Sequence, residues 1–100
     1  MSERHYIALS IKHSIYEKRN FLEYWLWGIE RTRDEEKRCF AGYTKSLERC
    51  ELYAPEEFDE HYGKGFAPIV HPSFDMVKKY QKYDTVLIDI DEYREFLKYV

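Results

Sequence analysis

The segment between Trp25 and Tyr43 has the pattern of a β-hairpin with aromatic arms. Two aromatic-rich runs, 25–29 and 39–43, enclose residues 30–38, almost all of which are ionisable. A hairpin explains this arrangement, because its arms pack against a core while its tip stays in water. The large side chains of the arms, which bury the most area per residue, are Trp25, Trp27, Phe40 and Tyr43. The chain is therefore predicted to fold around this hairpin.

A helix is the alternative for the first arm. Residues 21–29 also fit a helical stripe of apolar side chains, whereas their aromatic content and Gly28 favour a strand. The second arm decides between the two, since the short aromatic run 39–44 needs a neighbouring strand and the first arm is the nearest one. We favour the hairpin. Gly28 and Gly42 then mark bulges or places where another group approaches the backbone closely.

Two further strands are expected near the ends of the chain. Residues 5–12 alternate, with Ile7, Leu9 and Ile11 on one side, which is the period of a strand with one buried face. Residues 85–90 (TVLIDI) are rich in β-branched side chains in a nearly continuous run, so we place this strand centrally in the sheet. The other predicted non-helical segments are a connection over 13–20, a short strand over 51–53 and a loop over 64–72.

Three helices are expected in the second half of the chain. Pro55 fits the first helical turn, the carboxylates that follow it suit the positive end of a helix dipole, and this helix should stop by Gly63. Ser73 can cap a helix that runs to Tyr80. The last helix begins after the strand, capped either by Asp89 together with Glu92 or by Asp91 alone, and its apolar stripe consists of Tyr93, Phe96, Leu97 and Val100.

These elements predict a small α+β fold. It consists of an antiparallel sheet of about four strands, with two or three short helices packed on one face, among them the last helix and the helix from Ser73. A chain of 100 residues forms a single domain, 1–100, and buries roughly 65% of its unfolded surface. The 44% hydrophobic content excludes disorder of the whole chain.

Composition also limits the location and the classes of partner. The net charge of −3 disfavours non-specific binding to nucleic acid, which requires neutralisation of phosphates. Two cysteines are too few for a disulfide framework and no apolar leader opens the chain, so a cytoplasmic location is expected. No apolar run approaches the about 18 residues of a membrane helix, so no membrane partner is expected.

No catalytic signature is present, and neither a cofactor nor a metal ion is predicted. The best zinc ligands would be Cys39, Cys50, His61 and His71, but gaps of ten or eleven residues do not bring zinc ligands together in close pairs, and Cys39 suits a buried strand position. Asp89 and Asp91 could share a divalent cation as part of a small metal-dependent enzyme, although helix capping also explains them. Possible nucleophile pairs are Ser10 with His13, and Cys39 with His5 or His71, none of which lies in a known motif.

Charged residues supply the candidate contact sites. A nucleic-acid-binding alternative uses the hairpin 25–45 with Arg31, Arg33, Lys37 and Arg38, but residues 38–45 match the RNP1 octamer of RNA-recognition motifs poorly, since Cys39 replaces a glycine and Gly42 an aromatic residue. An acidic surface could instead occupy the basic groove of a nucleic-acid-binding protein. The predicted partner-binding residues are Arg31, Arg33, Asp34, Glu35, Glu36 and Lys37 in the hairpin tip, and Glu56, Glu57, Asp59 and Glu60 in the helix after Pro55.

Most of the chain resembles small uncharacterised proteins encoded by phages and mobile elements of Gram-positive bacteria. The resemblance is carried by YIALSIKHS (6–14), LWGIERTRDEEKRCFAGYT (26–44), ELYAPEEF (51–58) and KKYQKYDTVLIDIDEY (78–93). It implies a compact protein that acts by binding a host protein. Proteins of this origin include inhibitors of CRISPR effectors and of other defence nucleases. We therefore expect a non-catalytic protein-binding module that inhibits a host defence complex.

Overall fold

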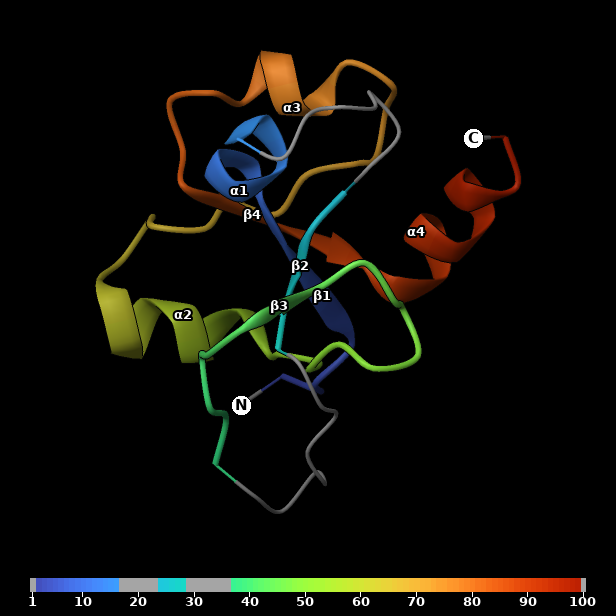
Figure 1. The fold of residues 1–100 in the computed structure, drawn as a ribbon. Helices are drawn as coiled ribbons and strands as arrows, with labels where there is room; N and C mark the ends of the chain where they lie inside the picture. Colours follow the sequence, from blue (N-terminus) through green and yellow to red (C-terminus); the bar gives the residue numbers. More distant parts are fainter. Residues whose placement is uncertain (1, 17–23, 29–36, 100) are drawn as a thin grey trace.

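A four-stranded antiparallel sheet forms the centre of the molecule (Figure 1). The computed structural model describes residues 2–16, 24–28 and 37–99. The strands lie in the order β3-β2-β1-β4, and their bounds are Tyr6–Ser10 for β1, Leu26–Trp27 for β2, Tyr43–Thr44 for β3 and Thr85–Asp89 for β4. The sheet and the helices around it confirm the predicted α+β class.

The predicted hairpin is confirmed by the pairing of β2 with β3. Leu26 lies opposite Thr44 and Trp27 opposite Tyr43 in an antiparallel register. The helical alternative is therefore wrong for the described part of the first arm, residues 24–28. The paired part of each arm has only two residues, fewer than predicted. Residues 29–36, which include most of the predicted tip, lie outside the described residues.

β1 is buried on both faces and is shorter than predicted, which corrects two predictions. Ile7, Ala8, Leu9 and Ser10 are all buried, because β1 lies between two strands and both of its faces are covered. The predicted single buried face is wrong. β1 also ends at Ser10, whose hydroxyl accepts a hydrogen bond from the backbone N–H of His13, and helix α1 (Ile11–Tyr16) follows where a longer strand and a connection were predicted.

β4 lies at the edge of the sheet, not at its centre as predicted. It pairs with β1 along its whole length, from Tyr6 opposite Asp89 to Ser10 opposite Thr85. On its other side, residues 68–70 of the predicted loop run parallel to it: the Leu87 N–H donates to the Pro68 carbonyl at 2.8 Å, and the Val70 N–H donates to the Leu87 carbonyl at 2.9 Å. This cover explains why the strand has the apolar sequence of a central one.

Helices pack on both faces of the sheet. One face carries α3 (Met76–Lys79) and α4 (Ile90–Leu97), as predicted, over a core that includes Leu9, Val86 and Ile88. Helix α2 (Pro55–Tyr62) covers the other face, where Phe58 packs with Leu87, so the helices are not confined to one side. Figure 1 shows α2 and α4 on opposite sides of the strands.

Local sequence signals define the ends of α2 and α4. Helix α2 starts at Pro55 and stops before Gly63, as predicted. Helix α4 is capped by Asp89, whose Oδ1 accepts hydrogen bonds from the N–H groups of Asp91 at 2.8 Å and Glu92 at 3.2 Å. Helix α3 is shorter than predicted, because the Ser73 hydroxyl donates to the Asp75 carboxylate and does not cap a helix. None of the helices within the described residues has the length and apolar character needed to cross a membrane.

A fully buried carboxylate, Glu51, joins the second hairpin arm to the core. It accepts hydrogen bonds from the Tyr53 hydroxyl at 2.8 Å and from the N–H groups of Cys39 at 3.0 Å and Phe40 at 3.3 Å. Burial, followed by the hydrogen bond to Glu51, raises the pKa of Tyr53 well above its usual range. Cys39 itself is exposed and Cys50 is the buried cysteine, so the prediction of a buried Cys39 is wrong.

Gly28 lies against this buried carboxylate. Its φ is +89°, and a Cβ at this position would lie 2.5 Å from the Glu51 Cβ and 2.6 Å from the Glu51 backbone nitrogen. The predicted close approach to Gly28 is therefore confirmed. Its N–H donates to the Gly42 carbonyl at 2.8 Å, which joins the two hairpin arms, and the Glu51 N–H donates to the Trp27 carbonyl at 3.2 Å, which holds the first arm next to residue 51.

Candidate functional site

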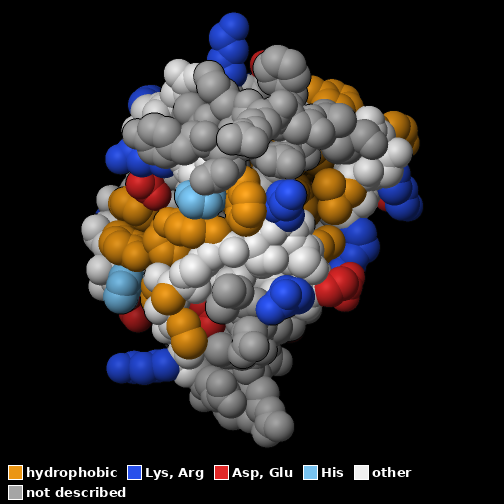
Figure 2. All heavy atoms as spheres, in the orientation of Figure 1, with side chains coloured by type: hydrophobic (Ala, Val, Ile, Leu, Met, Phe, Trp, Pro, Cys, Tyr) orange, Lys and Arg blue, Asp and Glu red, His pale blue; other side chains and the backbone are white. Residues whose placement is uncertain are grey.

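Aromatic side chains form a continuous patch on the face of the sheet that α2 covers. Each ring packs against at least one other ring of the set, with centroids 4.5–6.0 Å apart. Figure 2 shows hydrophobic side chains gathered over α2 and β3, with histidine side chains at the margins. We call this patch the aromatic band and define it as Trp27, Phe40, Tyr43, Tyr62 and Phe66.

The hairpin and α2 together create the aromatic band. Trp27 and Tyr43 face each other across β2 and β3, with ring centroids 5.2 Å apart. Tyr62, in the last turn of α2, packs on Phe66 at 4.5 Å and on Trp27 at 6.0 Å. The Trp27 indole N–H donates to the Thr85 hydroxyl at 2.9 Å, and this buried hydrogen bond fixes the orientation of the ring. The Trp27 ring at the centre of the band is therefore held in place by the fold.

A histidine stacks on each end of the aromatic band. His13 lies parallel to Tyr43 with centroids 4.3 Å apart, and His61 lies parallel to Phe40 at 4.1 Å. Tyrosine hydroxyls are neutral at physiological pH, and burial raises the pKa of Tyr43 and Tyr62 further above it. The surface thus combines neutral aromatic area with polar groups at its rim, a composition typical of protein interfaces.

The exposed edge of the band is formed by Tyr62. Its side chain is 40% exposed, whereas Trp27 beneath it is 7% exposed. Phe40, Tyr43 and Phe66 are half-buried. Rings that already pack on one another lose little conformational freedom on binding, so they can contribute contact area at low entropic cost.

A pocket of about 370 Å³ opens beside the Phe40 end of the band. It lies between the N-terminal segment, residues 37–40 and α2. Three predicted partner-binding residues line it: Lys37 comes from the hairpin segment, and Glu57 and Glu60 come from α2, a distant part of the sequence. The complete lining is Arg4, Lys37, Arg38, Phe40, Glu57, Glu60 and His61. The pocket therefore presents charges of both signs next to the aromatic surface.

The predicted acidic contact residues of α2 divide into two kinds. Glu56 and Glu57 bind the N-terminal segment: Glu56 accepts from Ser2, a contact that lowers the pKa of its carboxyl, and Glu57 pairs with Arg4 at 3.1 Å. Glu57 also accepts from the Ala54 N–H at 2.8 Å, which satisfies the start of α2.

Asp59 and Glu60 are exposed, although Asp59 accepts from the Gly65 N–H at 3.3 Å. Their contact with a partner stays a prediction. So does that of Arg31, Arg33, Asp34, Glu35 and Glu36, which lie outside the described residues.

The basic residues of the hairpin offer little to nucleic acid within the described segment. Arg38 is only 7% exposed, and its Nη1 donates to the Leu52 carbonyl at 3.0 Å. Lys37 is exposed. Because a basic side chain must reach solvent to neutralise a phosphate, Arg38 is poorly placed for the role that the nucleic-acid-binding alternative with hairpin 25–45 gives it, whereas Lys37 is accessible.

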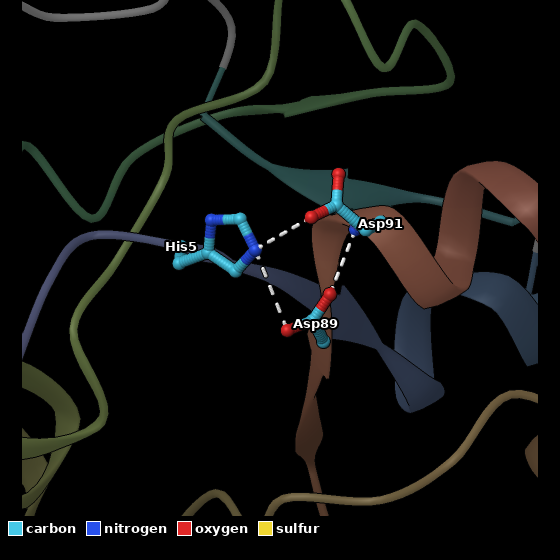
Figure 3. A group of neighbouring side chains, drawn as sticks. All are labelled: His5, Asp89 and Asp91. Carbon is cyan, nitrogen blue, oxygen red and sulfur yellow. Dashed lines mark hydrogen bonds and ion pairs between the residues drawn. The ribbon is translucent and has the colours of Figure 1, made fainter.

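A second candidate site lies at the start of α4, where His5 meets Asp89 and Asp91 (Figure 3). The His5 Nε2 is 3.0 Å from an Asp91 carboxylate oxygen and 3.4 Å from one of Asp89. The D-x-D pair was visible in the sequence, but His5 was not, because only the register that sets Tyr6 opposite Asp89 brings it there.

Among the described residues, the His5 cluster is the one group of three or more possible metal ligands. Cys39, Cys50, His61 and His71 therefore do not form the zinc site considered above. Ser10 and His13 are in contact, but through the backbone N–H of His13, so this pair caps α1 and does not place an imidazole on the hydroxyl. No protein-family model matches the chain, and neither a curated protein nor a solved structure matches it significantly.

Proposed function

We propose that this chain is a non-catalytic protein-binding module and that the aromatic band, together with the pocket beside it, is its contact surface. The observation that carries the proposal is the run of packed rings from Tyr43 through the buried Trp27 and the exposed Tyr62 to Phe40, with a histidine stacked at each end. Tyr, Trp and Phe are enriched at interfaces because they supply a large rigid area, and the residues that contribute most to affinity are commonly of these types.

The proposed partner is a host protein. The resemblance to proteins of phages and mobile elements supports this class of partner, and within it a defence complex such as a CRISPR effector. The charged side chains of Lys37 and Glu60 lie beside the aromatic surface, which is consistent with such a role. Charges at the rim of an interface contribute more to the specificity of binding than to its affinity. An inhibitor of this kind acts by occupying a surface that the complex needs, so it requires no catalytic group of its own.

The proposal is tested by affinity capture from lysate of a Gram-positive host, treated with nuclease and read by mass spectrometry. Tyr62→Arg places a charge at the exposed edge of the band and should weaken binding of the captured protein by about 30-fold or more, the effect of losing an interface hot spot of roughly 2 kcal/mol. Tyr99→Arg is the matched control, because Tyr99 is 72% exposed and lies outside the band. It should leave capture unchanged.

A further variant tests the hairpin tip. The double variant Arg31→Glu with Arg33→Glu should weaken the same interaction if the predicted tip contacts take part. Circular dichroism checks that each variant is folded. The proposal fails if Tyr62→Arg and Tyr99→Arg bind the captured protein equally well, and it also fails if nuclease treatment abolishes capture, since nucleic acid would then be the true ligand.

A further inference from the structure

We propose that His5, Asp89 and Asp91 bind one divalent transition-metal ion, with Zn²⁺ preferred over Mg²⁺ and Ca²⁺. Figure 3 shows the three side chains pointing toward one another from the segment before β1, the end of β4 and the first turn of α4. One donor atom from each lies within 4.8 Å of the others. The proposal concerns a site separate from the aromatic band and does not depend on the proposed function.

The backbone holds the three ligands in position. Tyr6 lies opposite Asp89 in the β1–β4 ladder, and the Ile90 N–H donates to the His5 carbonyl at 3.0 Å. These bonds fix the residue that carries the imidazole beside the residue that caps α4. A site on paired strands and a capped helix keeps its geometry better than one on a loop.

Each carboxylate directs one oxygen toward the imidazole and uses the other elsewhere. Asp89 Oδ1 accepts from the N–H groups at the start of α4, and Asp91 Oδ1 is 3.6 Å from the Arg94 guanidinium. The Oδ2 atoms of Asp89 and Asp91 are the ones that face His5 Nε2. Second-sphere contacts of this kind orient metal ligands in proteins.

The distances from the imidazole nitrogen to the two carboxylates match those around a common ion. A tetrahedral ion with bonds of about 2.1 Å separates its ligands by roughly 3.4 Å, and octahedral neighbours lie roughly 3.0 Å apart. The His5 Nε2 lies 3.4 Å from Asp89 Oδ2 and 3.0 Å from Asp91 Oδ2. The side chain of Asp91 is 70% exposed and can rotate to bring the two carboxylates closer. Little rearrangement is therefore needed to place an ion between them.

The donor set selects the class of metal. Mg²⁺ and Ca²⁺ favour ligand sets made entirely of oxygen, whereas an imidazole nitrogen with carboxylate oxygens suits Zn²⁺ and its neighbours in the first transition row. Two carboxylates balance the charge of a divalent ion. The positive end of α4 opposes a cation, but Asp89 Oδ1 already satisfies two of its N–H groups.

The test is isothermal titration of the full chain with Zn²⁺, in a Cys39→Ser background that removes the exposed thiol. One ion should bind per chain, and His5→Ala and Asp91→Asn should each weaken binding at least about tenfold, as expected for loss of a ligand. His71→Ala is the matched control, because His71 also pairs with a carboxylate of α4, Glu92, at 2.6 Å but stands outside the cluster. It should leave the affinity unchanged.

NMR provides an independent readout, since the ¹⁵N shift of His5 Nε2 should change on addition of Zn²⁺. The proposal is overturned if no stoichiometric binding occurs, if His5→Ala binds as tightly as the parent, or if His71→Ala loses as much affinity as His5→Ala. Equal affinity for Mg²⁺ and Zn²⁺ would overturn the assignment of the metal class.

Discussion

Replacing Gly28 with alanine should destabilise the domain more than the same change at Gly65. The two glycines have similar positive φ values, +89° and +83°, which an alanine rarely adopts. Their surroundings differ: a Cβ on Gly28 would lie 2.6 Å from the Glu51 backbone nitrogen, whereas a Cβ on Gly65 would meet nothing within 4 Å. The pair therefore separates the cost of the backbone conformation from the cost of the contact.

The magnitudes follow from these two terms. A left-handed conformation costs an alanine about 1–2 kcal/mol, and this applies at both positions. Overpacking in a dense interior adds typically about 1–3 kcal/mol, and this applies at Gly28 alone. The clash is with backbone, so it cannot be relieved by turning a side chain, and a shift would strain the 3.2 Å hydrogen bond from the Glu51 N–H to the Trp27 carbonyl. We expect a loss of about 2–5 kcal/mol for Gly28→Ala and about 1–2 kcal/mol for Gly65→Ala.

Urea denaturation followed by tryptophan fluorescence measures both losses. The smaller entropy of the unfolded chain that alanine brings is common to the two variants and cancels in their difference. The free energies of unfolding should differ by more than about 1 kcal/mol. Equal losses at Gly28 and Gly65 would refute the packing of the hairpin against Glu51.

Three other predictions use the same denaturation assay. Glu51→Gln should cost about 2–3 kcal/mol, because an amide cannot accept all the hydrogen bonds of the buried carboxylate, and unchanged stability would contradict the network. Burial is the main cause that raises the pKa of Tyr53 and Tyr93, so above pH about 10 the unfolded state loses protons that the native state keeps. The free energy of unfolding should therefore be constant for these two groups up to pH about 10 and then fall by up to about 1.4 kcal/mol per pH unit for each tyrosine. A flat profile at higher pH would refute this. Trp27→Phe should cost about 1–3 kcal/mol through loss of the indole hydrogen bond to Thr85, whereas a cost near zero would show that this bond is not needed.

The elements that could be predicted from the sequence are those with local signals. Pro55 and Gly63 define the ends of α2, and Asp89 defines the start of α4, because each acts on backbone groups within a few residues. The hairpin was predictable because its aromatic arms are close in the sequence. The fold class follows from these elements and from the strong strand pattern at each end of the chain.

The predictions that failed depend on contacts between distant segments. Nothing near β4 indicates that residues 68–70 cover its edge, so its apolar sequence was interpreted as that of a central strand. The start of α1 was missed because Ile11 continues the alternation of β1, while Ser10 ends the strand by capping the helix. For the same reason the D-x-D pair was found without His5, and the aromatic band was visible only as a composition rich in tyrosine.

The cover on β4 has a consequence for behaviour in concentrated solution. A flat, apolar edge strand can recruit strands from other chains and so begin aggregation. Here the N–H and carbonyl of Leu87 are both bonded to residues 68–70, and Pro68 has no N–H with which to extend a ladder outward. Residues 68–70 contribute little to the sheet but cover the free edge of β4. That edge can pair with another chain only after residues 68–70 detach.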